Sequence, residues 1–330
     1  MHVRRAADRA EWDGFLDGRA ATTPFHRWDW LSTQAELHGW RFEPLVVERS
    51  GWAVGVVPLL LTRLGPVWRA APVPFPYAGP VVLDGELGDV LAAVAGWSRR
   101  HGVVGARLDL PPQAAADPEV LRAAHASVEL GETFVVDLAP GGVLQDEETA
   151  LRQLHKSARR TLRHTERDGL RVEDAGEWQV VAWLPDLLEQ VYAHHGEPCP
   201  YPPGVGRTVW QLLRGRPGAA HVRAAVTADG EPAGLLVSLA EGDTVYEWAG
   251  GSFAAGRRAG AEVALHADLV RWAVARGYRR IDLVGSVDEG VRRFKRSLGG
   301  RSASFQMASQ SANPLWRAAR QARELLPRAS

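Results

Sequence analysis

Residues 99–110 read RRHGVVGARLDL, and residues 274–283 read VARGYRRIDL. In both stretches a helical pattern ends at a glycine, and a short strand pattern follows that closes on Asp-Leu. Each stretch lies downstream of a hairpin pattern, whose turn contains Gly51 in the first case and Gly230 in the second. Because this order occurs only twice, it predicts a duplicated α/β unit rather than a solenoid.

The rest of the chain alternates between helical and strand patterns, which predicts a mixed α/β fold. We expect helices at residues 8–17, 28–38, 86–101, 113–126, 147–168, 177–195, 205–214, 260–276, 288–297 and 314–326. We expect strands at residues 42–48, 52–64, 105–110, 132–138, 221–228, 231–241, 243–250, 278–285 and 301–309. The turn-rich stretch 139–148 separates the copies, so the expected domains are residues 1–142 and 143–330.

Composition excludes several classes of protein. Lys and Arg together number 39, as do Asp and Glu, so the 330-residue chain as a whole is not attracted to DNA or to an anionic membrane. No apolar run approaches the roughly 18–20 residues that cross a bilayer, and the first residues lack the apolar core of an export signal. Cys199 is the single cysteine, which fits a reducing compartment. We therefore expect a cytoplasmic protein without an integral membrane segment.

Lysine occurs only at Lys156 and Lys295, and arginine supplies every other cationic side chain. A lysine ammonium is compact, whereas the arginine guanidinium is a broad planar fork. The two lysines either mark sites where the fork does not fit or have survived by chance on the surface.

A one-sided basic stripe is the first candidate site. Its members occur at i, i+3, i+4, i+7 and i+11, which places them on one face of a helix. They are Lys156, Arg159, Arg160, Arg163 and Arg167. Such a stripe is either a solvated face or a surface that contacts phosphates, and the lack of acids before Glu166 favours phosphates.

Lys295 follows Phe294 in RRFKRSLGG, residues 292–300. A lysine near a developing oxyanion can stabilise it. The alternative is a basic C-terminal end of a surface helix, which the helix dipole favours. His194, His195 and Cys199 have no metal-ligand spacing, so we expect no metal.

Several segments in this order resemble the Fem-type (FemABX-like) aminoacyltransferases, which consist of two acetyltransferase-like (GNAT) domains. The segments are YAGP (77–80), KSARRTLRHTERDGL (156–170), WAGGS (248–252), YRRIDLVG (278–285) and RRFKRSLGG (292–300). The resemblance extends from TPFHRWDWL (23–31) to the Phe-Lys motif. It implies that an amine attacks the ester carbonyl of an aminoacyl-tRNA and forms an amide, with no metal or bound cofactor.

The resemblance also implies roles for individual residues. Lys295, beside Phe294, corresponds to the active-site lysine of the family. Trp248 would lie near the reacting amine, and the basic stripe would meet the tRNA acceptor stem. The remaining residues expected to bind substrate are Tyr77, Gly79 and Ser252.

Two departures from the family favour a small acceptor amine over a muramyl peptide. No lysine precedes Lys156, and the segment GEPCPYPP (196–203) lacks a basic residue. A peptidoglycan interpeptide-bridge enzyme is therefore an alternative, as is a binding-only duplicate.

An acyl-CoA-dependent N-acyltransferase is the main alternative. In acetyltransferases the pyrophosphate loop opens a helix, and here Arg257 and Gly260 fit that loop, but Glu262 would repel pyrophosphate.

Overall fold

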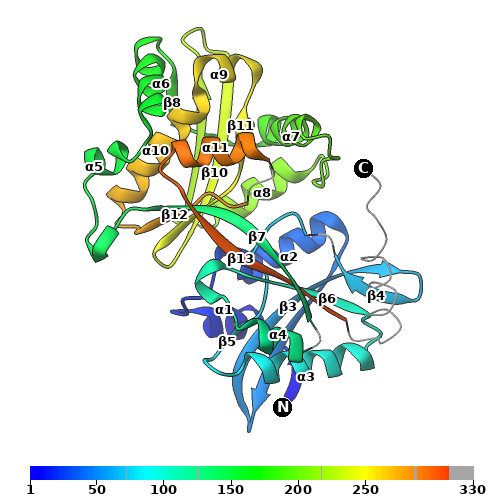
Figure 1. The fold of residues 1–330 in the computed structure, drawn as a ribbon. Helices are drawn as coiled ribbons and strands as arrows, with labels where there is room; N and C mark the ends of the chain where they lie inside the picture. Colours follow the sequence, from blue (N-terminus) through cyan, green and yellow to red (C-terminus); the bar gives the residue numbers. More distant parts are fainter. Residues whose placement is uncertain (72, 125, 217, 286–287, 312–330) are drawn as a thin grey trace. The chain divides into compact units, whose positions relative to one another are not determined.

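The computed structural model describes residues 1–311 except residues 72, 125, 217, 286 and 287. The same order of elements occurs twice along the chain (Figure 1): strand, two helices, three strands, helix, strand, helix and strand. The first copy contains β1 (His2–Arg5), α1 (Arg9–Leu16), α2 (Trp28–His38), β2 (Arg41–Arg49), β3 (Trp52–Leu64), β4 (Val67–Ala70), α3 (Leu87–Arg100), β6 (Gly105–Leu110), α4 (Pro118–Ala123) and β7 (Ala126–Asp137), with β5 (Val81–Val82) added before α3.

The second copy repeats this order and adds three helices. Its elements are β8 (Arg171–Asp174), α7 (Glu177–His194), α8 (Val205–Arg214), β9 (Ala220–Val226), β10 (Pro232–Glu241), β11 (Thr244–Ser252), α10 (Ala261–Ala275), β12 (Arg280–Asp282), α11 (Glu289–Ser297) and β13 (Arg301–Ser311). The additions are α5 (Glu147–Arg152), α6 (Lys156–Arg167) and α9 (Ala254–Ala259). The predicted mixed α/β duplication is thereby confirmed.

The last strand of each copy pairs with strands of the other copy. The chain forms two compact units, one of Met1–Gly131 with the described residues from Ser304 onward, the other of Glu132–Ala303. In the first unit β13 pairs antiparallel with β6, and in the second unit the end of β7 pairs antiparallel with β12. These bounds differ from the expected domains 1–142 and 143–330, because turn residues do not reveal which sheet a strand joins.

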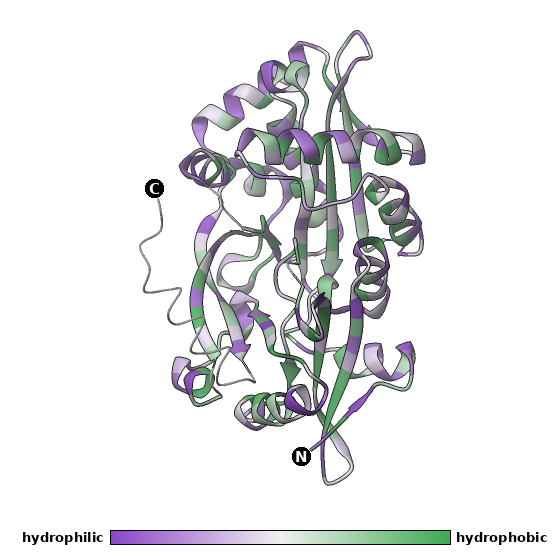
Figure 2. Cartoon of the chain, turned by 90° about the vertical axis from the view of Figure 1, so that its right-hand side faces the viewer, coloured by the Kyte–Doolittle hydropathy of each residue, from purple (hydrophilic) through white to green (hydrophobic). Residues whose placement is uncertain are grey.

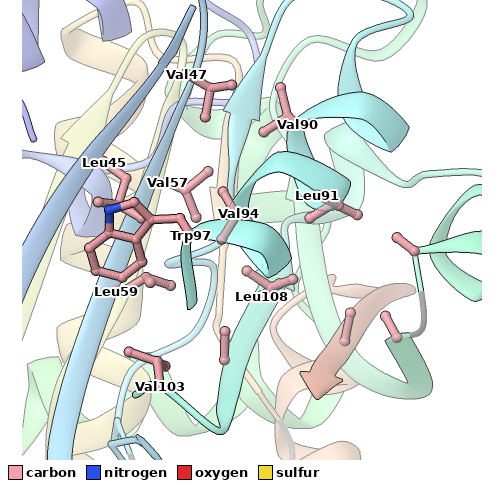
Figure 3. Close-up of a cluster of buried hydrophobic side chains, with 14 of the residues drawn as sticks. Leu45, Val47, Val57, Leu59, Val90, Leu91, Val94, Trp97, Val103 and Leu108 are labelled. Atoms are coloured by element: carbon pink, nitrogen blue, oxygen red, sulfur yellow. The ribbon is translucent and has the colours of Figure 1, made fainter. Parts of the chain in front are cut away.

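The core of the first unit lies between β2, β3 and α3. Leu45 and Val57 are opposite each other in the antiparallel β2–β3 pair, and both belong to one buried cluster with Val94 (Figure 3). Phe42 has the opposite parity on β2 and contacts the ring of Trp12 on α1. Period-2 alternation therefore places α3 and α1 on opposite faces of this sheet.

In the second unit, β12 continues a sheet in the order β12-β11-β10-β9-β8. β11 runs parallel to β12 and antiparallel to β10. A β-bulge interrupts the β10–β11 pair: Val237 faces Ala249 and Ser238 faces Glu247, so Trp248 is the extra residue. Long hydrophobic stretches lie along the strands, whereas polar and apolar residues alternate along the helices (Figure 2).

Three expected helices differ from the structure or lie beyond it. The helix expected at residues 113–126 is shorter, because Pro118 begins α4, which ends at Ala123, and β7 begins at Ala126. The single helix expected at residues 147–168 is wrong, because the chain breaks between α5 and α6, where the His155 side chain caps the N-terminus of α6. The helix expected at residues 314–326 lies outside the described residues. Among the helices that the structure describes, none is long and apolar enough to span a membrane.

Candidate functional site

The Lys295 ammonium lies in the second unit, bound to the turn that follows β12. Its Nζ donates hydrogen bonds to the carbonyl oxygens of Leu283, Val284 and Gly285, at 2.5, 2.8 and 2.5 Å. We call these three groups the carbonyl cradle. The turn needs left-handed backbone at Val284 (φ 42°) and Gly285 (φ 70°). An ammonium has three donors, and all three are used here.

The cradle explains one of the two lysines. The lysine side chain is 8% exposed, and three carbonyls converge on one nitrogen, a geometry that a compact ammonium satisfies and a planar guanidinium does not. Lys156 is instead exposed at the start of α6, and no contact with another described residue explains its identity. Of the two lysines, only Lys295 therefore occupies a position where an arginine does not fit.

Further charged groups surround Lys295 without touching the cradle. His266 on α10 lies 2.9 Å from a carboxylate oxygen of Glu247 on β11, and its Nδ1 donates to the backbone oxygen of Glu262 at 2.6 Å. Because a carbonyl oxygen only accepts, Nδ1 carries a proton, and Nε2 faces a carboxylate. The Phe294 ring packs edge-on against the imidazole, with centroids 5.3 Å apart.

The pKa values of the buried groups near Lys295 are shifted by burial and by one another's charges. Burial lowers the pKa of His266, but the Glu247 carboxylate outweighs it and the net shift is upward. Burial raises the pKa of Glu247, but the His266 and Lys295 charges bring it below its usual range. Burial also raises the pKa of Glu262 and lowers that of Lys295. These directions favour a charged pair of His266 and Glu247, and they disfavour the charged forms of Glu262 and Lys295.

Trp248 occupies the bulge and faces a different set of residues. Its indole Nε1 donates to the hydroxyl of Tyr201 at 3.2 Å, and the two rings meet edge-on. Trp248 is 8% exposed, and burial raises the pKa of Tyr201. Ser252, at the end of β11, is also buried. The structure therefore keeps these two expected substrate-binding residues largely away from solvent, and their role remains a prediction.

The basic stripe forms one exposed face of α6. All five of its side chains are exposed, and the buried residues Ala158, Leu162 and Thr165 lie on the opposite side of the helix. Among the described residues, only Arg167 of this set forms an ion pair, with the neighbouring Asp168. We call this surface the basic face (Lys156, Arg159, Arg160, Arg163 and Arg167).

The other side of α6 covers the N-terminus of α10. A Cβ atom added at Gly260, the residue before α10, would lie 2.5 Å from the Thr161 side chain and 3.0 Å from that of Thr165. Glu262 stands in the first turn of α10. The place where a GNAT helix usually presents free N–H groups to a pyrophosphate is therefore closed by a neighbouring helix and carries a carboxylate.

The YAGP segment lies in the first unit and is closely packed. Tyr77 is fully buried, with φ 62°, and its ring meets Phe305 edge-on at 5.1 Å. A Cβ atom at Gly79 would lie 2.4 Å from the backbone oxygen of Asp109, so only glycine permits this approach. Both residues contribute to the fold, and their expected contact with an acceptor remains a prediction. The structure brings Gly79 against Asp109, in the Asp-Leu pair that closes the first strand pattern.

Comparisons with known proteins agree with this fold. Residues 152–296 match the family model of the acetyltransferase (GNAT) domain. The structure is similar to that of FemX, with a TM-score of 0.70, 13% identity, and coverage of 93% of this chain and 97% of that one. It is also similar to L-PGS from Bacillus licheniformis (TM-score 0.56, 12% identity, 100% of each chain). No curated protein matches the sequence.

A third similar structure is a tandem GNAT protein from the clavulanic acid biosynthesis pathway, with a TM-score of 0.55 and 15% identity over 91% of this chain and 92% of that one. At these identities the likeness concerns the fold alone. The chain thus has a tandem GNAT fold, as its repeated order of elements and its motifs predicted.

Removing the Lys295 ammonium should destabilise the second unit. We expect Lys295→Met to lower the free energy of unfolding by about 2–4 kcal/mol, because three carbonyls lose their donor. Lys295→Arg should also destabilise, because the fork does not converge on the cradle. Lys156→Met, at an exposed position, is the control and should change the value by no more than about 0.5 kcal/mol. Urea unfolding measures all three, and a stable Lys295→Met protein would show that the cradle is dispensable.

The buried imidazolium predicts a pH dependence. His266 has a raised pKa in the folded state, so its contribution to stability is complete below the pKa of an unfolded histidine, near 6.5, and is lost as pH rises through the folded value. We expect the stability difference between the wild type and His266→Gln to shrink from pH 6 to pH 9 in urea unfolding. Burial lowers the pKa of His38, so His38→Gln should give the opposite trend. A difference independent of pH at His266 would contradict the charged pair.

Proposed function

We propose that the protein is an aminoacyltransferase that uses an aminoacyl-tRNA as donor and the amine of a small or peptide molecule as acceptor. The amine nitrogen forms a bond to the ester carbonyl carbon, and the bond from that carbon to the ribose oxygen breaks. The amine loses a proton and the ribose oxygen gains one, so the reaction needs no oxidant or reductant. The cytoplasm, where charged tRNA is available, fits this donor.

The basic face of α6 is the observation that carries the proposal. Five cationic side chains are exposed together on a protein with no net charge, and the one ion pair described among them is to an adjacent residue. A local cluster of this kind contacts successive phosphates of a nucleic acid backbone. It lies within the segment 152–296 that matches the GNAT domain, in the same unit as Lys295.

The closed N-terminus of α10 supports tRNA over CoA as the donor. Thr161 and Thr165 of α6 pack against Gly260, and Glu262 occupies the first turn. A pyrophosphate brought to this helix end would meet both a neighbouring helix and a carboxylate. The family match to acetyltransferases favours the other candidate, an acyl-CoA-dependent N-acyltransferase. An experiment that identifies the donor distinguishes these two functions.

In the proposed reaction Lys295 supplies positive charge for the oxyanion that develops on the ester carbonyl. Its three donors are held by the carbonyl cradle, so the oxyanion would replace one of these carbonyls as an acceptor. Phe294 fixes the helix that carries the lysine by packing on His266. Trp248 and Ser252 of the second unit, and Tyr77 and Gly79 of the first unit, are proposed to bind the substrates.

The donor is tested by supplying the purified protein with a mixture of amines and either tRNA charged with labelled amino acids or acetyl-CoA. We expect a labelled amide that forms only with charged tRNA and disappears when RNase is added first. Release of free CoA in place of that product would establish the CoA-dependent alternative. A product only with muramyl-peptide precursors would identify an interpeptide-bridge enzyme, and no product with either donor would leave the binding-only duplicate.

Reversing charge on the basic face should weaken tRNA binding. We expect the double variant Arg159→Glu and Arg163→Glu to lose at least about tenfold in affinity, and the slope of log affinity against log salt to fall by about two, because two phosphate contacts are lost. The matched control is Arg207→Glu with Arg214→Glu, which reverses two exposed charges on α8. Equal losses in the two double variants, measured by fluorescence anisotropy with labelled tRNA, would show that no specific face is involved.

A further inference from the structure

An exposed tryptophan of the second unit has no role in the groups described so far. Trp178, in the first turn of α7, is 62% exposed. Its ring and that of the buried Trp183 meet edge-on, with centroids 5.4 Å apart and an interplanar angle of 83°. Whichever of the two rings presents its edge, Trp183 covers at most one face of the Trp178 indole. Trp178 is therefore a flat apolar surface that is supported from the protein side and open to solvent.

The short helix α9 connects this tryptophan pair with the helix that carries the basic face (Figure 1). Trp183 packs edge-on against Phe253, the N-cap residue of α9, with ring centroids 5.9 Å apart. At the other end of α9, the C-cap residue Gly260 lies against Thr161 of α6. At 1.5 Å per residue, the six residues of α9 span about 9 Å. The tryptophan pair and α6 are therefore neighbours across one short helix.

α9 itself adds two cations between them. Arg257 and Arg258 are exposed in its last turn, and neither forms an ion pair with another described residue. Arg257 Nη1 donates a hydrogen bond to the backbone oxygen of Ser252 at 2.7 Å, which fixes that guanidinium beside the helix. The exposed Glu177 precedes Trp178, so a phosphate is not expected at the tryptophan itself. An uncharged aromatic group is not repelled there.

We infer that Trp178 stacks on an unpaired base of an RNA strand whose phosphates lie along Arg257, Arg258 and the basic face. Every nucleotide base has a π face, so an exposed indole beside a row of cations fits a single-stranded nucleic acid of any sequence. This inference rests on the proposed function, in which the strand is the unpaired 3′ end of the charged tRNA and the paired stem lies on α6. Trp178 is assigned binding of the donor and no chemical step.

The test compares two labelled RNA hairpins that share one stem, the first with an unpaired 3′ end and the second blunt, by fluorescence anisotropy. We expect the wild type to bind the first hairpin about tenfold more tightly, because one stacked base contributes this much. Trp178→Ala should lose that advantage and leave the affinity for the blunt hairpin unchanged, whereas Trp178→Phe should keep most of it. Trp52→Ala is the matched control, because Trp52 is 79% exposed in the first unit, and it should change neither affinity.

Salt dependence separates stacking from an effect of charge. Stacking releases no counterions, so Trp178→Ala should keep the slope of log affinity against log salt for the hairpin with the unpaired end. Arg258→Ala should instead reduce that slope by about one, because one phosphate contact is lost. If Trp178→Ala does not fold, Trp178→Leu replaces it, because leucine keeps an apolar contact with Trp183 and lacks an aromatic face.

The outcomes also separate this inference from the proposed function. Equal binding of the two hairpins to the wild type, an unchanged affinity in the Trp178 variants, or an equal loss for both hairpins would overturn the inference and leave the tRNA-dependent reaction standing. Tighter binding through Trp178 combined with no amide from charged tRNA would overturn the proposed function and leave the site. No binding of either hairpin would overturn both.

Discussion

The second unit depends on one buried ammonium group held by three carbonyls. The turn after β12 curls through two left-handed residues, Val284 and Gly285, and only a donor at its centre satisfies the oxygens that this curl brings together. Because the cation is buried, nearby carboxylates must balance it, and because these are buried as well, Glu247 takes His266 as a second cation. The end of β12 therefore lies among buried charges from three other elements: Lys295 on α11, His266 on α10 and Glu247 on β11.

Duplication then explains how the two units have come to differ. Each copy brings a helix, a short strand and an aspartate to the same place in the fold. The copies differ in that only the second has a lysine near this aspartate, Lys295. In the second copy the aspartate is completed by Thr133, Val284 and the nearby ammonium. In the first copy Asp109 keeps an oxygen that no described residue serves. The second copy therefore completes its carboxylate with groups of its own fold, whereas the first copy uses Arg107 at one oxygen only.

The sequence predicted the features that depend on local pattern. The bounds of α2, α8 and β6 agree with their periodicity, and the basic face lies on the exposed side of α6 because its residues repeat at helical spacing. The pairing of Glu247 with His266 had no such pattern, because these residues meet only when α10 packs on β11. The strand exchange between copies was equally hidden, since β7 and β13 look like ordinary strands in sequence.

The two faces of α6 together favour an RNA donor. Its buried face closes the helix end on which CoA-dependent relatives of this fold place a pyrophosphate, and its exposed face presents cations in a row. With 39 cationic and 39 acidic side chains, the protein has no general attraction for polyanions, so any affinity for RNA must come from such a local surface. In the proposed reaction, a helix that covers one phosphate site and offers another would change the donor without changing the sheet beneath it. A single added element would then be enough for this fold to use a different acyl carrier.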